Sequence, residues 1–539
     1  MKKIFRMTAM LIFLGSMLAS CHKIDVAVTT ELTPSVFPQD SLQYIEAAGA
    51  AYVALRGNYA LDYWFMQSAS TDESILPSRG GNWYDNQNYS MLHYHSWTKD
   101  HGWTGSCWGY LEKVIGVSNQ AINILNGTMP EGNNKNETIA ELKMVRALGY
   151  FMMMDLYGNV PIDTTYGDFT PHANVSRAQV FNFIEQDVKS CLPYLSREVS
   201  MLTYGRVTKY SAYALLAKMY LNAEYYTGKQ RYNDCIIASD SVINSGNYAL
   251  EPRGTYLNQF YPNNGPSDKE FIFVIPYSPT YATGYGLNGN MYFARYDVPR
   301  SEAKKFGLPF TPSAPRSTLP EFYAYFNDPG DIRNAQWLTG LQYMNDGVTP
   351  VTVTTTNQGY DFKYSGSNPN GSYTYQVNLT PNILLRLNPG TFDLGNDEIA
   401  WNMGYRNIKF LPDATSTNRN QNNDIPMFRY SDIILMKAEA ILRGGAATNG
   451  ATALSLVNQL RANRSISAPW ANVTLDSIYN ERCREFAWES WHRNDMIRFG
   501  KYEGTWGFKT DNNTYKRIFP IPTSAMQVNP ALVQNPGYK

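Results

Sequence analysis

The chain of 539 residues carries 46 basic and 46 acidic side chains, so it has no net charge, which argues against a nucleic-acid partner because such a partner normally needs a basic face. A hydrophobic content of 43% supports a sizeable core, and no low-complexity linker divides the chain, so a single large unit with long excursions is expected. Aromatic residues reach 14%, and such an excess indicates a recognition surface because rings give large contact areas at low entropy cost.

The N-terminus has the pattern of an export signal. Three basic residues precede an apolar run, Met7–Met17, which is too short to span a membrane comfortably but fits a signal-peptide core. Leu18-Ala19-Ser20-Cys21 resembles the lipobox of bacterial lipoproteins, in which cleavage leaves the cysteine as an acylated N-terminus. This resemblance implies a signal peptide over 1–20, lipidation at Cys21 and a tether over 21–40. The alternative is an ordinary signal peptide with a coincidental cysteine.

The segment Asp72–Trp108 has the most distinctive composition of the chain. Seven aromatic residues lie between Trp83 and Trp108, and glycines in the segment and just after it mark it as loop-rich: Gly80, Gly81, Gly102, Gly105 and Gly109. Loops that present rings to solvent can stack on flat apolar faces, including those of sugar rings. A second aromatic cluster extends from Tyr277 to Tyr296. The alternative for any one of these rings is burial in the core, where large aromatic side chains are often found.

We expect Asp72–Trp103, helped by the second cluster, to form a sugar-binding face. Trp83 and Tyr84 are the preferred platform because glycines just before them let the backbone turn and expose a ring. Asp72, Arg79 and Asn82 would supply hydrogen bonds to hydroxyls. The predicted glycan-binding residues are Asp72, Arg79, Asn82, Trp83, Tyr84, Trp97, Trp103, Tyr292 and Tyr296. In the alternative interpretation, Trp83 packs beneath the loop and Arg79 only ties the loop down.

No metal, cofactor or catalytic residue is predicted. His93, His95 and His101 share the aromatic segment, but no acidic or cysteine ligand is spaced to complete a metal site. No G-x-S-x-G, Walker, H-E-x-x-H or C-x-x-C motif is present. Beyond Cys21, four cysteines permit either two disulfides or buried free thiols: Cys107, Cys191, Cys235 and Cys483.

Helical periodicity dominates the chain on both sides of a long irregular region. The pattern predicts helices at Leu42–Leu61, Trp108–Leu125, Glu137–Tyr157, Ser176–Leu195, Thr208–Tyr226, Tyr232–Asn244, Ser431–Leu442 and Ala451–Arg461. Pairs of this length are similar to tetratricopeptide-type units, although the internal repeat is faded. Between Leu250 and Pro426 the chain is rich in Gly, Pro and Asn, and a β-hairpin is predicted where Phe362–Tyr364 and Tyr373–Leu379 flank Asn370-Gly371.

The stretch Ile478–Lys501 is strongly charged. Read as a helix, it places Glu481, Glu485 and Glu489 four residues apart with arginines interleaved, so opposite charges lie within side-chain reach. Apolar residues at helical spacing would form a buried stripe. We interpret the charges as structural, since buried charges persist mainly when they are paired.

Four separated motifs resemble the SusD/RagB family. Its C-terminal signature is matched by Glu481, Arg482, Glu485, Phe486, Glu489, Arg493, Asp495, Met496 and Arg498. The family usually has Gly after the third acid, where this chain has Ser490. The stretch Arg146–Ile162, the pair Gly205-Arg206 and the closing Gln534–Tyr538 resemble the other motifs.

The resemblance implies a mainly α fold, a single SusD-like domain over 41–539. Tetratricopeptide-type helix pairs would occupy about 41–250 and 427–500, with four such units in the family. A long irregular, partly β excursion would fill about 251–426, and a tail would cover 501–539.

The resemblance also implies a function, that of a cell-surface lipoprotein anchored in outer-membrane lipid and facing outward. Such a protein binds a glycan without cleaving it and delivers it to a SusC-like TonB-dependent transporter. One alternative is a glycoside hydrolase, since carboxylates beside aromatic rings can cleave sugars. Binding is favoured because the acids of Glu481–Asp495 alternate with arginines, while the aromatic loops have few acids. A scaffold that binds only protein would require the tryptophan cluster to be wholly buried.

Overall fold

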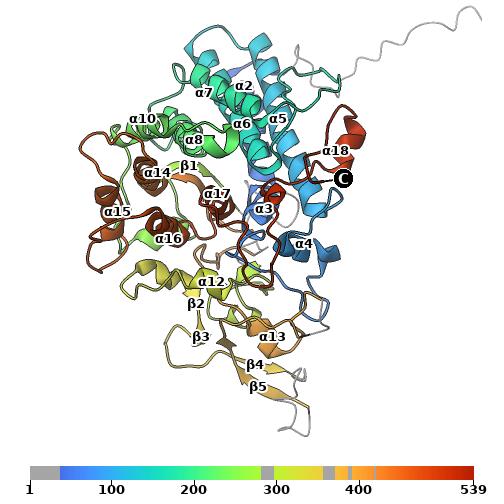
Figure 1. Ribbon diagram of the computed structural model, residues 1–539, viewed down its shortest axis with the longest axis vertical. Coiled ribbons are helices and arrows are strands. Elements are labelled where there is room, and N and C mark those ends of the chain that lie inside the picture. The colour runs from blue at the N-terminus through green and yellow to red at the C-terminus, as the bar shows by residue number, and fades with distance from the viewer. Residues whose placement is uncertain are drawn as a thin grey trace, which may run out of the picture.

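The computed structural model describes residues 37–278, 280, 296–355, 371–386, 391–417 and 420–538. This part is mainly helical, with small two-stranded sheets, as predicted (Figure 1). Cys21, Tyr292 and the predicted strand Phe362–Tyr364 lie outside the described residues. Within the described ranges, no helix has both the length and the apolar character needed to cross a membrane.

The N-terminal helices follow the predicted order. They are α2 (Ser41–Gly57), the π-helix η1 (Tyr59–Tyr63), α3 (Trp64–Ser68), the 3-10 helix η2 (Asp85–Gln87), α4 (Asn88–Tyr94), α5 (Gly102–Thr128), α6 (Asn133–Tyr157), α7 (Arg177–Cys191), α8 (Lys209–Leu221), α9 (Ala223–Thr227) and α10 (Tyr232–Ile243). Ser176 and Thr208 form capping boxes that begin α7 and α8, because each side chain accepts from the backbone N–H three residues on. Asn222 separates α8 from α9, where one helix was predicted.

Helix α5 begins six residues before the predicted start at Trp108. The ring of His101 accepts from the Thr104 N–H and caps the helix at its N-terminus. Gly102 therefore lies in a helix, as do Gly105 and Gly109, and reading these three glycines as loop residues was wrong.

The C-terminal helices pack beside the N-terminal array. They are α14 (Tyr430–Leu442), α15 (Ala453–Ala462), α16 (Leu475–Glu485), α17 (His492–Arg498), the 3-10 helix η7 (Thr514–Arg517) and α18 (Thr523–Val528). Successive neighbours are in contact from α2 to α5, α5 to α6 and α6 to α7, and again from α8 to α10, α10 to α14 and α14 to α15 (Figure 1). The four described cysteines are free, buried thiols, which decides between the two alternatives that the sequence allowed.

The excursion is an insertion between α10 and α14. Strand β1 (Phe271–Ile275) leaves the helical array and β8 (Ile425–Arg429) returns to it, and the two pair antiparallel with every residue buried. This pairing brings the two ends of the insertion together and lets α14 pack on α10. The helical array therefore continues across the insertion.

Most of the excursion is irregular, and its elements are short. They are η3 (Tyr256–Phe260), η5 (Arg300–Glu302), α12 (Pro320–Tyr323), η6 (Ile332–Gln336), β2 (Trp337–Leu338), β3 (Gly340–Leu341), β4 (Thr352–Thr355), β5 (Tyr373–Gln376), β6 (Asn378–Leu379), α13 (Glu398–Asn402) and β7 (Arg406–Asn407). The predicted Tyr373–Leu379 strand is divided into β5 and β6, which pair antiparallel with β4 and β3, respectively.

The charged stretch is two helices rather than one. Helix α16 ends at Glu485, a bend follows, and α17 starts at His492. In the bend Trp488 has φ of 63° and Ser490 has φ of 64°, values that are uncommon for residues with a side chain. The single-helix prediction was wrong because tertiary contacts hold the bend: the indole of Trp64 donates to the Trp488 carbonyl.

The prediction that these charges are structural is confirmed. Glu485 is buried and accepts hydrogen bonds from Arg333, Arg429 and Arg464 at 2.9–3.1 Å. Burial alone would raise the pKa of Glu485, but the three guanidiniums hold it well below its usual range. Because Arg333 belongs to the excursion, the network fastens the excursion to the helical array.

Candidate functional site

The loop that follows Arg79 is tightly held. Its backbone closes a turn between Arg79 and Asn82, in which Arg79 N lies 2.8 Å from Asn82 O. The carboxylate of Asp393 accepts from the N–H groups of Gly80 and Gly81 at 2.8 and 2.9 Å. These bonds clamp the loop to a segment of the excursion more than 300 residues away in the sequence.

The same loop holds an unusual run of left-handed backbone. Trp83, Asp85, Asn86 and Gln87 have φ between 44° and 67°, and none is glycine. Such conformations cost free energy and persist only where the surroundings impose them, which is most frequent at functional sites. The result is that Tyr84 projects outward with 50% of its surface exposed, and its hydroxyl accepts from Gln87 at 2.7 Å.

Two hollows flank this loop. One, of about 220 Å³, is lined by Trp83, Tyr84, Gln87, Tyr94 and Phe392 among others. The other, of about 300 Å³, is lined by Asn82, Pro299, Arg300, Ser301, Ala314, Val353, Asn396, Glu398, Trp401 and Asn402. Together they present aromatic rings beside hydrogen-bonding groups, which suits a polar ligand with flat apolar faces.

A buried aromatic cluster supports Trp83 from beneath. Trp83 is half-buried, and its ring centroid lies 5.1 Å from that of Tyr296. Tyr296 packs against Phe65, which in turn packs against Trp103 at 4.7 Å. Trp103 and Tyr296 are thus brought near Trp83, but they act as its support because Tyr296 is 5% exposed and Trp103 is half-buried.

Three of the predicted binding residues are structural, and we correct them here. Asp72 is buried and accepts from the His492 ring at 2.5 Å, which fixes its segment to α17. Trp97 is 1% exposed, and its indole donates to the Tyr538 hydroxyl at 2.7 Å. Arg79 is wholly buried, and its guanidinium donates to the carbonyl oxygens of Pro77 and Pro315. Burial removes all three from a solvent-facing surface.

The structure adds residues that the sequence had not suggested. Trp401, on α13, is half-buried, and its indole donates to Asn396 at 3.0 Å. The Arg300 guanidinium lies over the Trp401 ring, 3.8 Å from its centroid. Trp401 lies outside both aromatic clusters that the sequence suggested, so clustering could not have identified it.

The three histidines of the aromatic segment have structural roles. His95 bonds the Ser70 carbonyl at 2.9 Å, and His101 caps α5. Burial lowers the pKa of His93 to about 3. Within the described residues, no three His, Cys, Asp or Glu side chains are grouped so that they could hold a metal ion.

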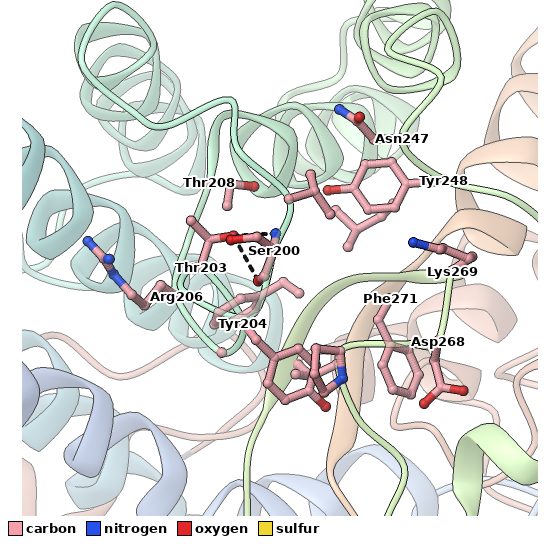
Figure 2. A pocket seen from close by; sticks show the side chains of 16 residues that line it. Ser200, Thr203, Tyr204, Arg206, Thr208, Asn247, Tyr248, Asp268, Lys269 and Phe271 are labelled. Atoms are coloured by element: carbon pink, nitrogen blue, oxygen red, sulfur yellow. Dashed lines mark hydrogen bonds between the residues drawn. The ribbon is translucent and has the colours of Figure 1, made fainter.

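Two further hollows lie on the helical array. A pocket of about 50 Å³ between the α7–α8 connection and β1 has room for water but not for a sugar ring (Figure 2). A wider groove of about 920 Å³ runs between α2 and α6, with Ile45 and Leu202 on its walls. Neither the small pocket nor the groove has an exposed aromatic ring held on a strained loop, which is the feature that distinguishes the surface around Tyr84.

The fold and this surface define a class of protein. Its members are arrays of helix pairs with an irregular insertion, and the insertion and the loop after Arg79 together present aromatic rings at the surface. The chain belongs to the SusD family, since the family model described as "SusD family" matches residues 214–518. A second model, described as "Starch-binding associating with outer membrane", matches residues 44–221. The resemblance seen in the sequence motifs is thereby confirmed.

Individual relatives are distant but cover most of the chain. "Starch-binding protein SusD" of Bacteroides thetaiotaomicron is 24% identical over 491 residues, which is 85% of this chain and 82% of that protein. A "Laminarin binding SusD-like protein" has a TM-score of 0.70 at 22% identity, covering 93% of this chain and 100% of that one. "Surface glycan-binding protein A from Bacteroides thetaiotaomicron in complex with laminarihexaose" has a TM-score of 0.70 at 19% identity, covering 92% and 99%. The structural likenesses show a shared fold.

Proposed function

We propose that this chain is a cell-surface lipoprotein that binds a glycan without cleaving it and delivers it to a SusC-like TonB-dependent transporter in the outer membrane. The observation that carries the binding is the strained loop that holds Tyr84 half-exposed between two hollows. Stacking of a ring on the C–H face of a pyranose needs this kind of fixed, outward aromatic side chain. The names of the relatives that bind starch and laminarin support the same ligand class.

The acids near the loop favour binding over hydrolysis. Glycosidases use a pair of carboxylates on either side of the scissile bond. Among the described residues that line the two hollows, Glu398 is the single acid. Asp393 lies close by, but its oxygens accept from backbone N–H groups. The surface therefore lacks a free pair of carboxylates in its described part.

Calorimetry with Tyr84→Ala tests the glycan-binding surface. Laminarihexaose and maltohexaose serve as probes, and the loss of one dominant ring is expected to cost about 2 kcal/mol, enough to abolish detectable weak binding. Tyr194→Ala is the matched control, since Tyr194 is 52% exposed but lies at the end of α7. Equal affinities for wild type and Tyr84→Ala would refute this surface.

A docking surface on the helical array supports the transporter partner. The α2–α6 groove is bordered by two exposed apolar side chains, Ile45 and Leu202. Exposed apolar patches mark protein interaction sites, and helical arrays offer extended surfaces to partners. Ile45→Glu is expected to reduce co-purification of the transporter from membranes, whereas Val53→Glu, on the same helix outside the groove, is not. Recovery of the wild type only as a free monomer would contradict the association.

The lipid anchor is tested separately. Cys21→Ala should release the protein from the membrane fraction in cells that lack the transporter. A variant that stays tightly membrane-bound there would contradict acylation at Cys21.

A further inference from the structure

The hollow beside Trp401 differs chemically from the hollow beside Trp83. Described residues lining the Trp83 hollow include no charged side chain, whereas Arg300 and Glu398 both line the Trp401 hollow. The difference lies next to the proposed stacking ring, because Asn82 borders this hollow and is two residues from Tyr84.

Arg300 is positioned but not neutralised by a direct bond. Arg300 is exposed, and the central carbon of its guanidinium lies over the Trp401 ring, 3.8 Å from the ring centroid. Among the described residues it makes no hydrogen bond and no ion pair within bonding distance. A guanidinium has five N–H donors in a planar fork, and no described residue takes up those of Arg300, while the Trp401 ring limits the motion of the side chain.

Two buried arginines contact Trp401 and add positive charge beside the hollow. Arg79 lies over the same Trp401 ring at 5.2 Å. It donates to the carbonyls of Pro77 and Pro315, and its Nε and Nη2 have no hydrogen-bond partner. Arg406 likewise donates to carbonyl oxygens, including that of Trp401 at 2.7 Å. Neither side chain is bonded to a carboxylate.

Three acids act on these three guanidiniums, and one of them, Asp297, acts on Arg406. Glu398 shares the hollow with Arg300, and Asp393 lies near Arg79 with its oxygens engaged by backbone N–H groups. Because Asp297 is already paired with Arg316, four positive charges face three negative ones. Arg316 and Arg386 of the excursion, by contrast, are each paired with an acid, Asp297 and Asp397.

We propose that the Trp401 hollow binds the oxyanion substituent of an acidic glycan, a carboxylate or a sulfate ester, with Arg300 donating to its oxygens. This inference rests on the proposed function and names the substrate class of the same surface. Both substituents present two or more oxygens in the spacing that a guanidinium fork accepts. The sugar ring would stack at Tyr84 while its charged substituent enters the hollow on the Asn82 side.

Three hexasaccharide probes test the inference by calorimetry: oligogalacturonate, a sulfated galactan fragment and neutral laminarihexaose. An acidic probe is expected to bind more tightly than the neutral one, and its affinity is expected to fall as salt is raised. Arg300→Gln should weaken the acidic probe about tenfold or more, in line with loss of hydrogen bonds to a charged group. Arg253→Gln, which removes an exposed charge outside both hollows, should leave all affinities unchanged. The acidic probe that loses more affinity in Arg300→Gln identifies the substituent as carboxylate or sulfate.

The outcomes separate this inference from the function on which it rests. A neutral probe that binds more tightly than both acidic ones, and that loses affinity in Tyr84→Ala, overturns the acidic substrate class and leaves glycan binding in place. Equal losses for acidic and neutral probes in Arg300→Gln overturn it as well. Glu398→Gln should strengthen the acidic probe alone, because it removes the one carboxylate in the described lining of the hollow.

Discussion

Replacement of Glu485 by Gln should destabilise the whole fold. The carboxylate is fully buried and accepts four hydrogen bonds from Arg333, Arg429 and Arg464. Glutamine keeps the shape of the side chain but removes the charge. Its NH₂ group also places two N–H donors opposite the N–H donors of the arginines, with which they cannot form hydrogen bonds. Breaking a buried ion pair on one side costs about 3–5 kcal/mol because the remaining charge stays buried without its partner. Each of the three arginines also pairs with another carboxylate, so a loss at the lower end of that range is expected.

Denaturant unfolding followed by tryptophan fluorescence measures the effect. Asp476→Asn is the matched control: Asp476 lies on the same helix and pairs with Lys501, but its side chain is 76% exposed. An exposed ion pair contributes about 0–1 kcal/mol, so the control should shift the midpoint little. If Glu485→Gln loses no more stability than Asp476→Asn, the buried network does not hold the excursion to the helical array.

Further predictions concern pH, the bend and the loop. Burial alone would raise the pKa of Glu481, but neighbouring arginines lower it to about 2. The ionised carboxylate therefore stabilises the fold fully above its unfolded pKa of about 4.3, and this stabilisation is lost as the pH falls toward 2. Glu481→Gln should flatten the acid side of a plot of stability against pH, and an unchanged acid side would contradict this. Ser490→Gly should raise the melting temperature and increase the free energy of unfolding by at most about 1 kcal/mol, because glycine adopts the left-handed backbone of this position without strain. The family usually has glycine here. A lower melting temperature would count against strain at Ser490. Gly80→Ala should weaken glycan binding more than Gly81→Ala, because both have positive φ but only a Cβ at Gly80 would meet Asn396, at 2.5 Å; equal calorimetric losses would argue that the contact is unimportant.

The helices were predictable because their signals are local. Apolar stripes and capping residues such as Ser176 and Thr208 act within a few residues of the helix that they define. The bend after Glu485 was not predictable from the same signals, since the charges on both sides of it keep helical spacing. It is imposed by contacts from distant segments, including the Trp64 indole on the Trp488 carbonyl.

The candidate site divides in the same way. Trp83 and Tyr84 could be chosen as candidates from the sequence because the glycines before them mark a local turn. The burial of Asp72 and Trp97 could not be read locally, because their partners are His492 and Tyr538, more than 400 residues away. Composition signals that rings are abundant, but the exposure of each ring is fixed by long-range packing.

The two sides of the proposed binding surface come from parts of the chain that meet only in the folded state, and this arrangement has a consequence for affinity. Asp393 holds the Gly80 loop from the excursion side, while Arg333 ties the excursion to α16 through Glu485. The ring of Tyr84 and the hollow of Trp401 are therefore fixed relative to each other before a ligand arrives. A prearranged surface loses little conformational entropy on binding, so even a few contacts can give measurable affinity. The same reasoning links the buried charges to the ligand: a change that loosens the arginine network should weaken glycan binding without touching any residue that lines either hollow.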